Sequence, residues 1–298
     1  MRAILFATLA LVACGGDDDG DSSSADTSAG TTSTSTGTIF QTTSGYVGTA
    51  HLAGTAFFEG APWAGAAIRF CDMDKCRSQD ADDSGVFDFP ETYADWNSLE
   101  VPGLHTQTDN DPKYVTAFVP LVFADNESRT VDLHVRELES FTSFGAGSTE
   151  IMAGSGLYLT VGATDLETPA LVDPATGVGG LRLDPAEWVP TDEIEGDVVH
   201  QWFTYPWNYT APNGLAVRVD GNALGMTGAS YHMYVGSYDA FRWLDVGELT
   251  DADGDGWYDC AGTLPLLSTV IIVEMPPATS TGTTGSMTTT SSTTTSST

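Results

Sequence analysis

Leu157-Tyr158-Leu159-Thr160-Val161 places an aliphatic residue at every second position. This is the period of a β-strand with one buried face, because successive side chains of a strand point to opposite faces of the sheet. The same alternation occurs at residues 131–135 and 215–219. Residues 268–273 form a continuous apolar run, as expected for a strand covered on both faces. These stretches predict an all-β protein.

Outward from these stretches, short runs rich in Val, Tyr, Phe, Trp and Thr recur every eight to fifteen residues, separated by Gly, Pro, Asn or Asp. No segment predicts a convincing helix. The alternation breaks near residues 139–150, so we expect two β-sandwich modules, at 49–138 and 150–275. Aromatic strands at 202–209, 231–238 and 241–244 favour an immunoglobulin-like sandwich for the second module.

The first module contains Gly54-Thr55-Ala56, then Gly60-Ala61-Pro62-Trp63-Ala64-Gly65-Ala66, then Asp82-Asp83-Ser84-Gly85-Val86-Phe87-Asp88-Phe89. These segments resemble the opening strand, the Pro-x-x-Gly-Ala turn and the Asp-Gly-x-Phe-x-Phe hairpin of the carboxypeptidase regulatory-like family. The resemblance covers about a third of the chain and implies a transthyretin-like β-sandwich. It implies no catalytic residues, because the family takes its name from an accessory domain beside a peptidase. The segment around Cys71 departs from the family's simplest pattern.

The N-terminus has the pattern of an export signal. Met1 and Arg2 precede an apolar run at residues 3–13, which is too short to span a bilayer. Leu11-Val12-Ala13-Cys14 resembles the lipobox of bacterial lipoproteins. That resemblance implies cleavage before Cys14 and acylation of its thiol, for example by palmitate. An ordinary secretory signal with a chance cysteine is the alternative.

The two ends of the mature chain are of low complexity. Residues 15–48 are rich in Gly, Asp, Ser and Thr and predict a disordered linker. Residues 276–298 predict a disordered tail, since 17 of the last 20 residues are Ser or Thr. We therefore expect a lipid-anchored protein of the cell envelope, most simply on the outer membrane, with its folded part periplasmic or at the surface.

The charge of the chain excludes nucleic acid as a partner. Its formal net charge is −31, with 41 acidic residues and only 10 Lys and Arg. A protein that neutralises phosphates needs clustered basic residues, and these are scattered. We relate the acidity to the solubility of the surface.

Three cysteines remain once Cys14 is acylated. Cys71 and Cys76 flank a polar turn, so a local disulfide between them is the preferred interpretation in an oxidising compartment. Zinc is the rival, but the chain has no second cysteine pair and no nearby His to complete four ligands. Cys260 is left over, either buried or available for intermolecular pairing.

Two acidic stretches are candidate Ca²⁺ sites. Asp251, Asp253, Asp255 and Asp259 occupy positions 1, 3, 5 and 9 of a loop with Gly256 at position 6, as in a calcium loop. Position 12 is Gly262, not the usual Glu. A second stretch has the full spacing, but it coincides with the predicted hairpin: Asp80, Asp82, Ser84, Gly85, Asp88 and Glu91. In both cases the alternative is an acidic hairpin turn, where Asp-Gly is favoured by the backbone alone.

No catalytic motif is recognisable. The chain has no His-Glu-x-x-His, Gly-x-Ser-x-Gly or phosphate loop, and its His are isolated: His51, His105, His134, His200 and His232. Aromatic residues at 202–209 could stack on sugar rings, although core filling is the simpler interpretation.

We therefore expect a non-enzymatic envelope lipoprotein that binds or supports a ligand such as a carbohydrate or an envelope protein. The alternatives are an accessory subunit of a secreted carbohydrate or peptide hydrolase, and a calcium-dependent adhesion protein.

Overall fold

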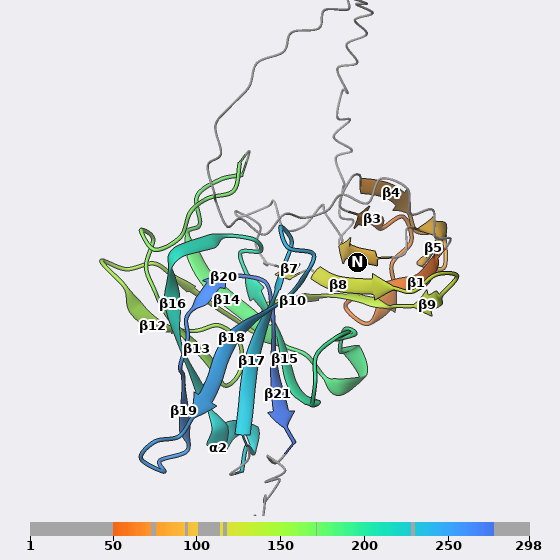
Figure 1. The fold of residues 1–298 in the computed structure, drawn as a ribbon. Helices are drawn as coiled ribbons and strands as arrows, with labels where there is room; N and C mark the ends of the chain where they lie inside the picture. Colours follow the sequence, from red (N-terminus) through yellow and green to blue (C-terminus); the bar gives the residue numbers. More distant parts are fainter. Residues whose placement is uncertain are drawn as a thin grey trace, which may run out of the picture. The chain divides into compact units, whose positions relative to one another are not determined.

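The computed structural model describes residues 50–72, 76–92, 95–100, 114–115, 118–170, 172–227 and 230–276. They belong to one compact unit of the chain, Gly45–Thr298. Nearly all of their regular structure is strand, which confirms the all-β prediction (Figure 1). The predicted signal peptide with Cys14, the linker at 15–48 and the tail beyond residue 276 lie outside the described residues.

Helix is confined to two short elements in the described part of the chain. These are the 3₁₀ helix η1 (Pro185–Glu187) and the α-helix α2 (Gly221–Leu224). Within the residues that the structure describes, no helix has the length and apolar character needed to cross a membrane.

The first ten strands form two sheets. The six-stranded sheet has the order β2-β1-β10-β7, with β5 and β9 also pairing with β1. Its strands are β1 (Ala50–Phe58), β2 (Ala61–Pro62), β5 (Val86–Thr92), β7 (Tyr114–Val115), β9 (Ser128–Thr130) and β10 (Leu133–Glu137). The four-stranded sheet has the order β4-β3-β6-β8. Its strands are β3 (Ala67–Asp72), β4 (Cys76–Asp80), β6 (Asp95–Glu100) and β8 (Phe118–Phe123).

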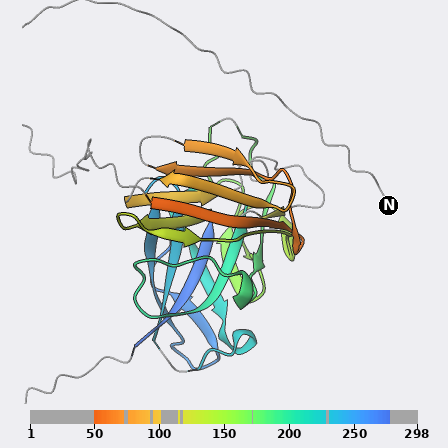
Figure 2. The same ribbon diagram turned by 90° about the vertical axis from the view of Figure 1, so that its right-hand side faces the viewer.

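These two sheets share one apolar core. Buried and partly exposed residues alternate along β1, as expected for a strand with one covered face. The ring of Phe70 on β3 lies 5.5 Å from that of Phe89 on β5, which joins the four-stranded sheet to the six-stranded one. Figure 2 shows the orange to yellow strands of these sheets gathered together.

The remaining strands form a single eleven-stranded sheet. Its order is β11-β14-β15-β21-β17-β18-β19-β16-β13-β12, with β20 also pairing with β16. The strands are β11 (Ser140–Ser143), β12 (Thr149–Met152), β13 (Leu157–Val161), β14 (Gly177–Arg182), β15 (Asp197–Tyr205), β16 (Thr210–Asp220), β17 (Ser230–Ser237), β18 (Arg242–Thr250), β19 (Trp257–Cys260), β20 (Leu264–Leu266) and β21 (Thr269–Met275).

This sheet curls until its two outer strands nearly meet. The Ser140 hydroxyl on β11 donates to the carbonyl of Met152 on β12 at 3.1 Å and accepts from the amide of Gly154 at 3.1 Å. Those bonds cover polar groups at the sheet edges, which would otherwise be open to further strand pairing. The result is a near-barrel.

Strand β21 explains why residues 270–273 are apolar without alternation. It lies between β15 and β17, and its residues from Thr269 to Val273 are all buried. Val270 and Ile272 belong to the core of the near-barrel, whereas Ile271 and Val273 belong to the apolar cluster that extends through the first two sheets. One strand therefore contributes to both cores.

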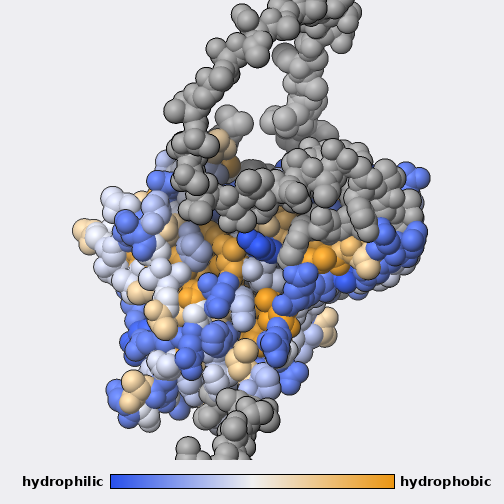
Figure 3. Space-filling view, in the orientation of Figure 1, coloured by the Kyte–Doolittle hydropathy of each residue, from blue (hydrophilic) through white to orange (hydrophobic). Residues whose placement is uncertain are grey.

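The outer surface is mostly hydrophilic. Figure 3 shows polar residues over most of the visible face, with apolar residues gathered toward its middle. Among the described residues, the large hydrophobic side chains that are exposed are Val86 and Met152.

Candidate metal site

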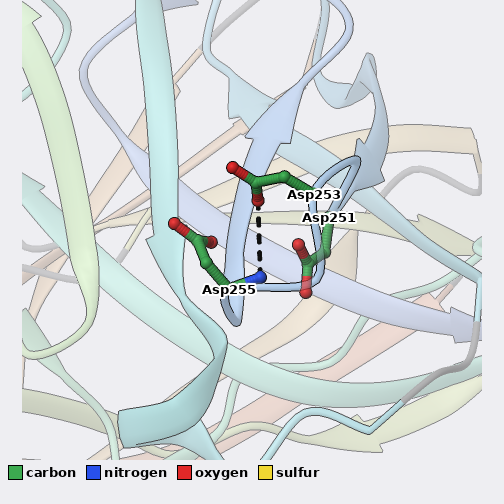
Figure 4. Close-up of side chains that lie close together, drawn as sticks. All are labelled: Asp251, Asp253 and Asp255. Carbon is green, nitrogen blue, oxygen red and sulfur yellow. Dashed lines mark hydrogen bonds between the residues drawn. The ribbon is translucent and has the colours of Figure 1, made fainter.

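The acidic loop at 251–256 joins β18 to β19. The two strands pair as Leu249 with Cys260 and Thr250 with Asp259, so the loop is the tip of a hairpin. Asp251, Asp253 and Asp255 each direct one carboxylate oxygen to a common region, where the three atoms lie within 4.8 Å of one another. Figure 4 shows the three side chains on this tip.

Hydrogen bonds within the loop fix these carboxylates. Both oxygens of Asp251 accept backbone N–H groups, from Gly254 at 2.8 Å and from Gly256 at 3.0 Å. Asp253 accepts the amide of Asp255 at 3.3 Å, which is the dashed line in Figure 4, and Asp255 accepts that of Trp257 at 2.8 Å. Carboxylate oxygens keep further lone pairs when they accept one N–H, so each can still contribute to a hard cation such as Ca²⁺.

The helix α2 supports the loop from the neighbouring strand connection. Asp220 caps this helix by accepting the amide of Ala223 at 2.9 Å, and the Asn222 side chain donates to the carbonyl of Asp255 at 2.9 Å. Gly256 has a φ of +86°, and a Cβ there would lie 2.0 Å from the Asn222 amide nitrogen. Sequence reasoning missed Asn222, although Asp220-Gly221-Asn222 is itself a turn signal.

Asp259 does not join the cluster. It lies on β19, and its carboxylate is 3.4 Å from the Nε of Arg218 on β16. Asp259 is kept away because strand β19 already begins at Trp257. The pairing of β19 with β16 therefore holds Asp259 in the sheet, opposite Arg218. Three of the four predicted ligands are therefore brought together.

The second acidic stretch forms a hairpin turn. Asp82 accepts the amides of Ser84 at 2.8 Å and Val86 at 2.9 Å, and Gly85 has a φ of +79°. Asp88 lies on β5 and pairs with His51 at 2.5 Å. No group of metal-binding side chains is found here among the described residues.

The structure joins Cys71 to Cys76 as a disulfide between paired positions of β3 and β4. Both sulfurs lie 3.8 Å from the hydroxyl of Tyr238, which belongs to the connection between β17 and β18 of the eleven-stranded sheet. Cys260 is the free cysteine of the described residues and is half-buried. Burial raises the pKa of its thiol, which makes the thiolate scarcer and the residue less reactive.

The aromatic run at 202–209 fills the core. Trp202, Phe203, Tyr205, Trp207 and Tyr209 are each at most 8% exposed. Their faces therefore pack against other side chains, and this run offers no open platform for a sugar ring. Trp257 is partly exposed, but the Arg218 guanidinium lies 4.6 Å above its ring.

The described His residues have separate partners. His134 lies 3.8 Å from Glu187, and His232 lies 3.7 Å from Asp245. His200 is 7% exposed and receives a hydrogen bond from Arg182 at 3.1 Å. Burial, together with this neighbouring cation, lowers the pKa of His200 to about 4, so the ring is neutral at pH 7. His105 lies outside the described residues.

Comparison with models of protein families and with curated proteins finds no match for this chain. The resemblance of residues 49–138 to the carboxypeptidase regulatory-like family stays a prediction made from its motifs.

Proposed function

We propose that this chain is a non-enzymatic lipoprotein of the cell envelope, anchored through Cys14 and carrying a rigid all-β body. The structural observation that supports this role is the joining of the three sheets. One apolar cluster runs from Leu52 on β1 to Ile271 and Val273 on β21. A core shared by the described strands of all three sheets suits a protein that displays a fixed surface at a distance from a membrane.

Polar contacts across the same junction add to its rigidity. The Thr269 hydroxyl on β21 donates to the carbonyl of Phe118 on β8 at 2.7 Å, and both residues are buried. Arg136 on β10 contacts Glu187 of η1 at 2.5 Å. A buried hydrogen bond and a partly buried ion pair each hold the two portions in one register.

Metabolic labelling tests the anchor. In a bacterial host fed an alkyne fatty acid, the full chain should incorporate label and fractionate with membranes. Cys14→Ser should lose the label, whereas Cys260→Ser, the matched control, should keep it. An unlabelled wild-type chain, or label that persists in the Cys14 variant, contradicts the proposal.

A calcium-dependent adhesion protein is the second candidate, and the converging carboxylates of Asp251, Asp253 and Asp255 favour it. A cation that binds only the folded state raises the melting temperature. The melting temperature of the full chain should therefore be higher in millimolar Ca²⁺ than in EGTA. Mg²⁺ should raise it less than Ca²⁺ does, because a flexible set of oxygens suits the larger ion.

Asparagine variants separate this binding from loop integrity. Asp253→Asn and Asp255→Asn keep an oxygen that accepts the loop hydrogen bonds but remove the charge. Both should abolish the Ca²⁺-dependent shift. Asp259→Asn should retain it, because that carboxylate lies outside the cluster. An unchanged melting temperature of the wild-type chain with Ca²⁺ rejects the calcium candidate while leaving the anchor proposal intact.

A further inference from the structure

A polar depression opens where the edges of the near-barrel meet. Its volume is about 280 Å³, just below the roughly 300–1,000 Å³ typical of ligand pockets, which limits an occupant to a small molecule. The lining residues are Glu139, Ser155, Arg182, Leu183, Asp184 and Pro185. They come from the residue before β11, the turn between β12 and β13, and the segment from the end of β14 to the start of η1.

Arg182 stands at the rim of the near-barrel. It pairs directly with Trp202 across β14 and β15, so the two side chains share one face of the sheet. Trp202 belongs to the near-barrel's core, and its indole N–H donates to the carbonyl of Ser155 at 3.0 Å. The mouth of a β-barrel is a common place for small-molecule sites.

The guanidinium of Arg182 is oriented but not neutralised. One N–H donates to Nδ1 of the buried His200 at 3.1 Å, and no carboxylate lies within ion-pair distance of Arg182 among the described residues. By contrast, Arg129 and Arg218 each contact two carboxylates. In a chain with 41 acidic residues, a half-buried arginine without a carboxylate partner has donors available for an anion.

The same depression also carries negative charge. Glu139 is held in place because its carboxylate accepts the amide of Ser155. The Asp184 carboxylate makes no hydrogen bond or ion pair with the described residues, although Asp184 is only two positions from Arg182. The depression therefore presents a guanidinium and carboxylates that do not neutralise one another.

We propose that this depression binds a small α-amino acid as its zwitterion. The ligand's carboxylate takes the planar fork of Arg182, and its ammonium group faces Asp184 and Glu139. A simple anion would meet repulsion from these two carboxylates, and a simple cation would meet repulsion from Arg182. A molecule with both charges satisfies both groups, and the limited volume favours a small side chain. This assignment goes beyond the proposed envelope role and does not depend on it.

Calorimetric titration of the full chain in detergent with glycine and L-alanine tests the assignment. Both should bind, whereas N-acetyl-L-alanine and L-alaninamide, each lacking one charge, should bind at least tenfold more weakly. Arg182→Gln should reduce L-alanine affinity at least tenfold. Arg242→Gln, which alters an exposed arginine elsewhere, should leave it unchanged.

Asp184→Asn keeps the proposal testable if the Arg182 variant does not fold. The Asp184 side chain is exposed and makes no hydrogen bond or ion pair with the described residues, so loss of its charge should weaken L-alanine binding severalfold without changing the melting temperature. Absence of binding by both amino acids overturns the proposal. So does equal affinity of the wild-type chain and the Asp184 variant.

Discussion

Asp192, on the connection between η1 and β15, accepts a hydrogen bond from the guanidinium of Arg129 on β9. The same carboxylate also accepts the amide of Val122 on β8 at 3.2 Å. The Asp192 carboxylate, which lies just before β15 of the eleven-stranded sheet, thus contacts both the six-stranded and the four-stranded sheet. Neither Asp192 nor Arg129 is more than 24% exposed, so solvent screens the pair only in part.

Asp192→Asn should lower the free energy of unfolding. The amide keeps an oxygen for Val122 but loses the charge that faces Arg129, which leaves that guanidinium with Glu127 alone. A cost of about 1–3 kcal/mol is expected for a partly buried charged hydrogen bond. Urea denaturation measures it.

Glu150→Gln is the matched control for this ion pair. Glu150 contacts Arg218 at 3.4 Å in a pair about 40% exposed on both sides, and such pairs contribute about 0–1 kcal/mol. Equal costs for the two variants would show that the Asp192 contact does not hold the sheets together.

The disulfide between Cys71 and Cys76 should stabilise the chain modestly. It joins residues only five positions apart, and the chain-entropy model gives about 2 kcal/mol for so short a loop. The double variant Cys71→Ser, Cys76→Ser should therefore unfold at lower urea, as should the wild-type chain under reductant. Cys260→Ser is the control: it keeps the disulfide, so reductant should lower its stability by the same amount as that of the wild type. A reductant-independent wild-type midpoint is the contrary result.

His200 should make stability depend on pH between about 4 and 6.5. Its folded-state pKa is lowered to about 4 by burial and by Arg182, whereas an unperturbed His titrates near 6.5. The unfolded chain therefore binds more protons in this window, so the contribution is complete above pH 6.5 and is lost as the pH falls toward 4.

A pair of urea titrations at several pH values measures this contribution. His200→Gln removes the titrating ring but keeps an oxygen that can accept from Arg182. Relative to this variant, the wild-type chain should lose about 3 kcal/mol by pH 4, since each unit of pKa shift corresponds to about 1.4 kcal/mol. Parallel pH profiles of the two proteins would show that His200 is not held neutral by the fold.

Much of the strand content could be predicted from local sequence. The alternations at 131–135, 157–161 and 215–219 fall in or beside β10, β13 and β16, and the apolar run at 268–273 falls mainly in β21. These signals are local because each strand's burial sets its own period. The pairing of β11 with β14 is not local. Strands β11 and β12 follow one another in the chain but lie at opposite ends of the sheet order, so closure of the near-barrel had no sequence signature.

The candidate sites divide in the same way. Asp251, Asp253 and Asp255 could be found because one loop carries all three. The spacing also suggested Asp259, but strand pairing, which spacing does not encode, directs it to Arg218. The depression around Arg182 could not be found, since its lining comes from three separated segments.

Gly256→Ala should destabilise the acidic loop more than Gly254→Ala. Both glycines have positive φ, at +86° and +77°, and a side chain in that conformation costs roughly 1–2 kcal/mol. A Cβ at Gly254 meets no atom within 4 Å, whereas one at Gly256 would lie 2.0 Å from the Asn222 amide. The Gly256 variant must therefore displace Asn222 and break its hydrogen bond to Asp255 as well.

A double-mutant cycle with Asn222→Ala separates strain from collision. If Asn222 is the obstacle, the cost of Gly256→Ala should fall in the Asn222→Ala background to that of Gly254→Ala, because contacting residues couple by about 0.5–3 kcal/mol. The Asn222 substitution should not change the cost of Gly254→Ala. Additive costs for Gly256→Ala and Asn222→Ala would mean that α2 does not support the loop. In that case the Asp251, Asp253 and Asp255 carboxylates would be held by their own turn alone.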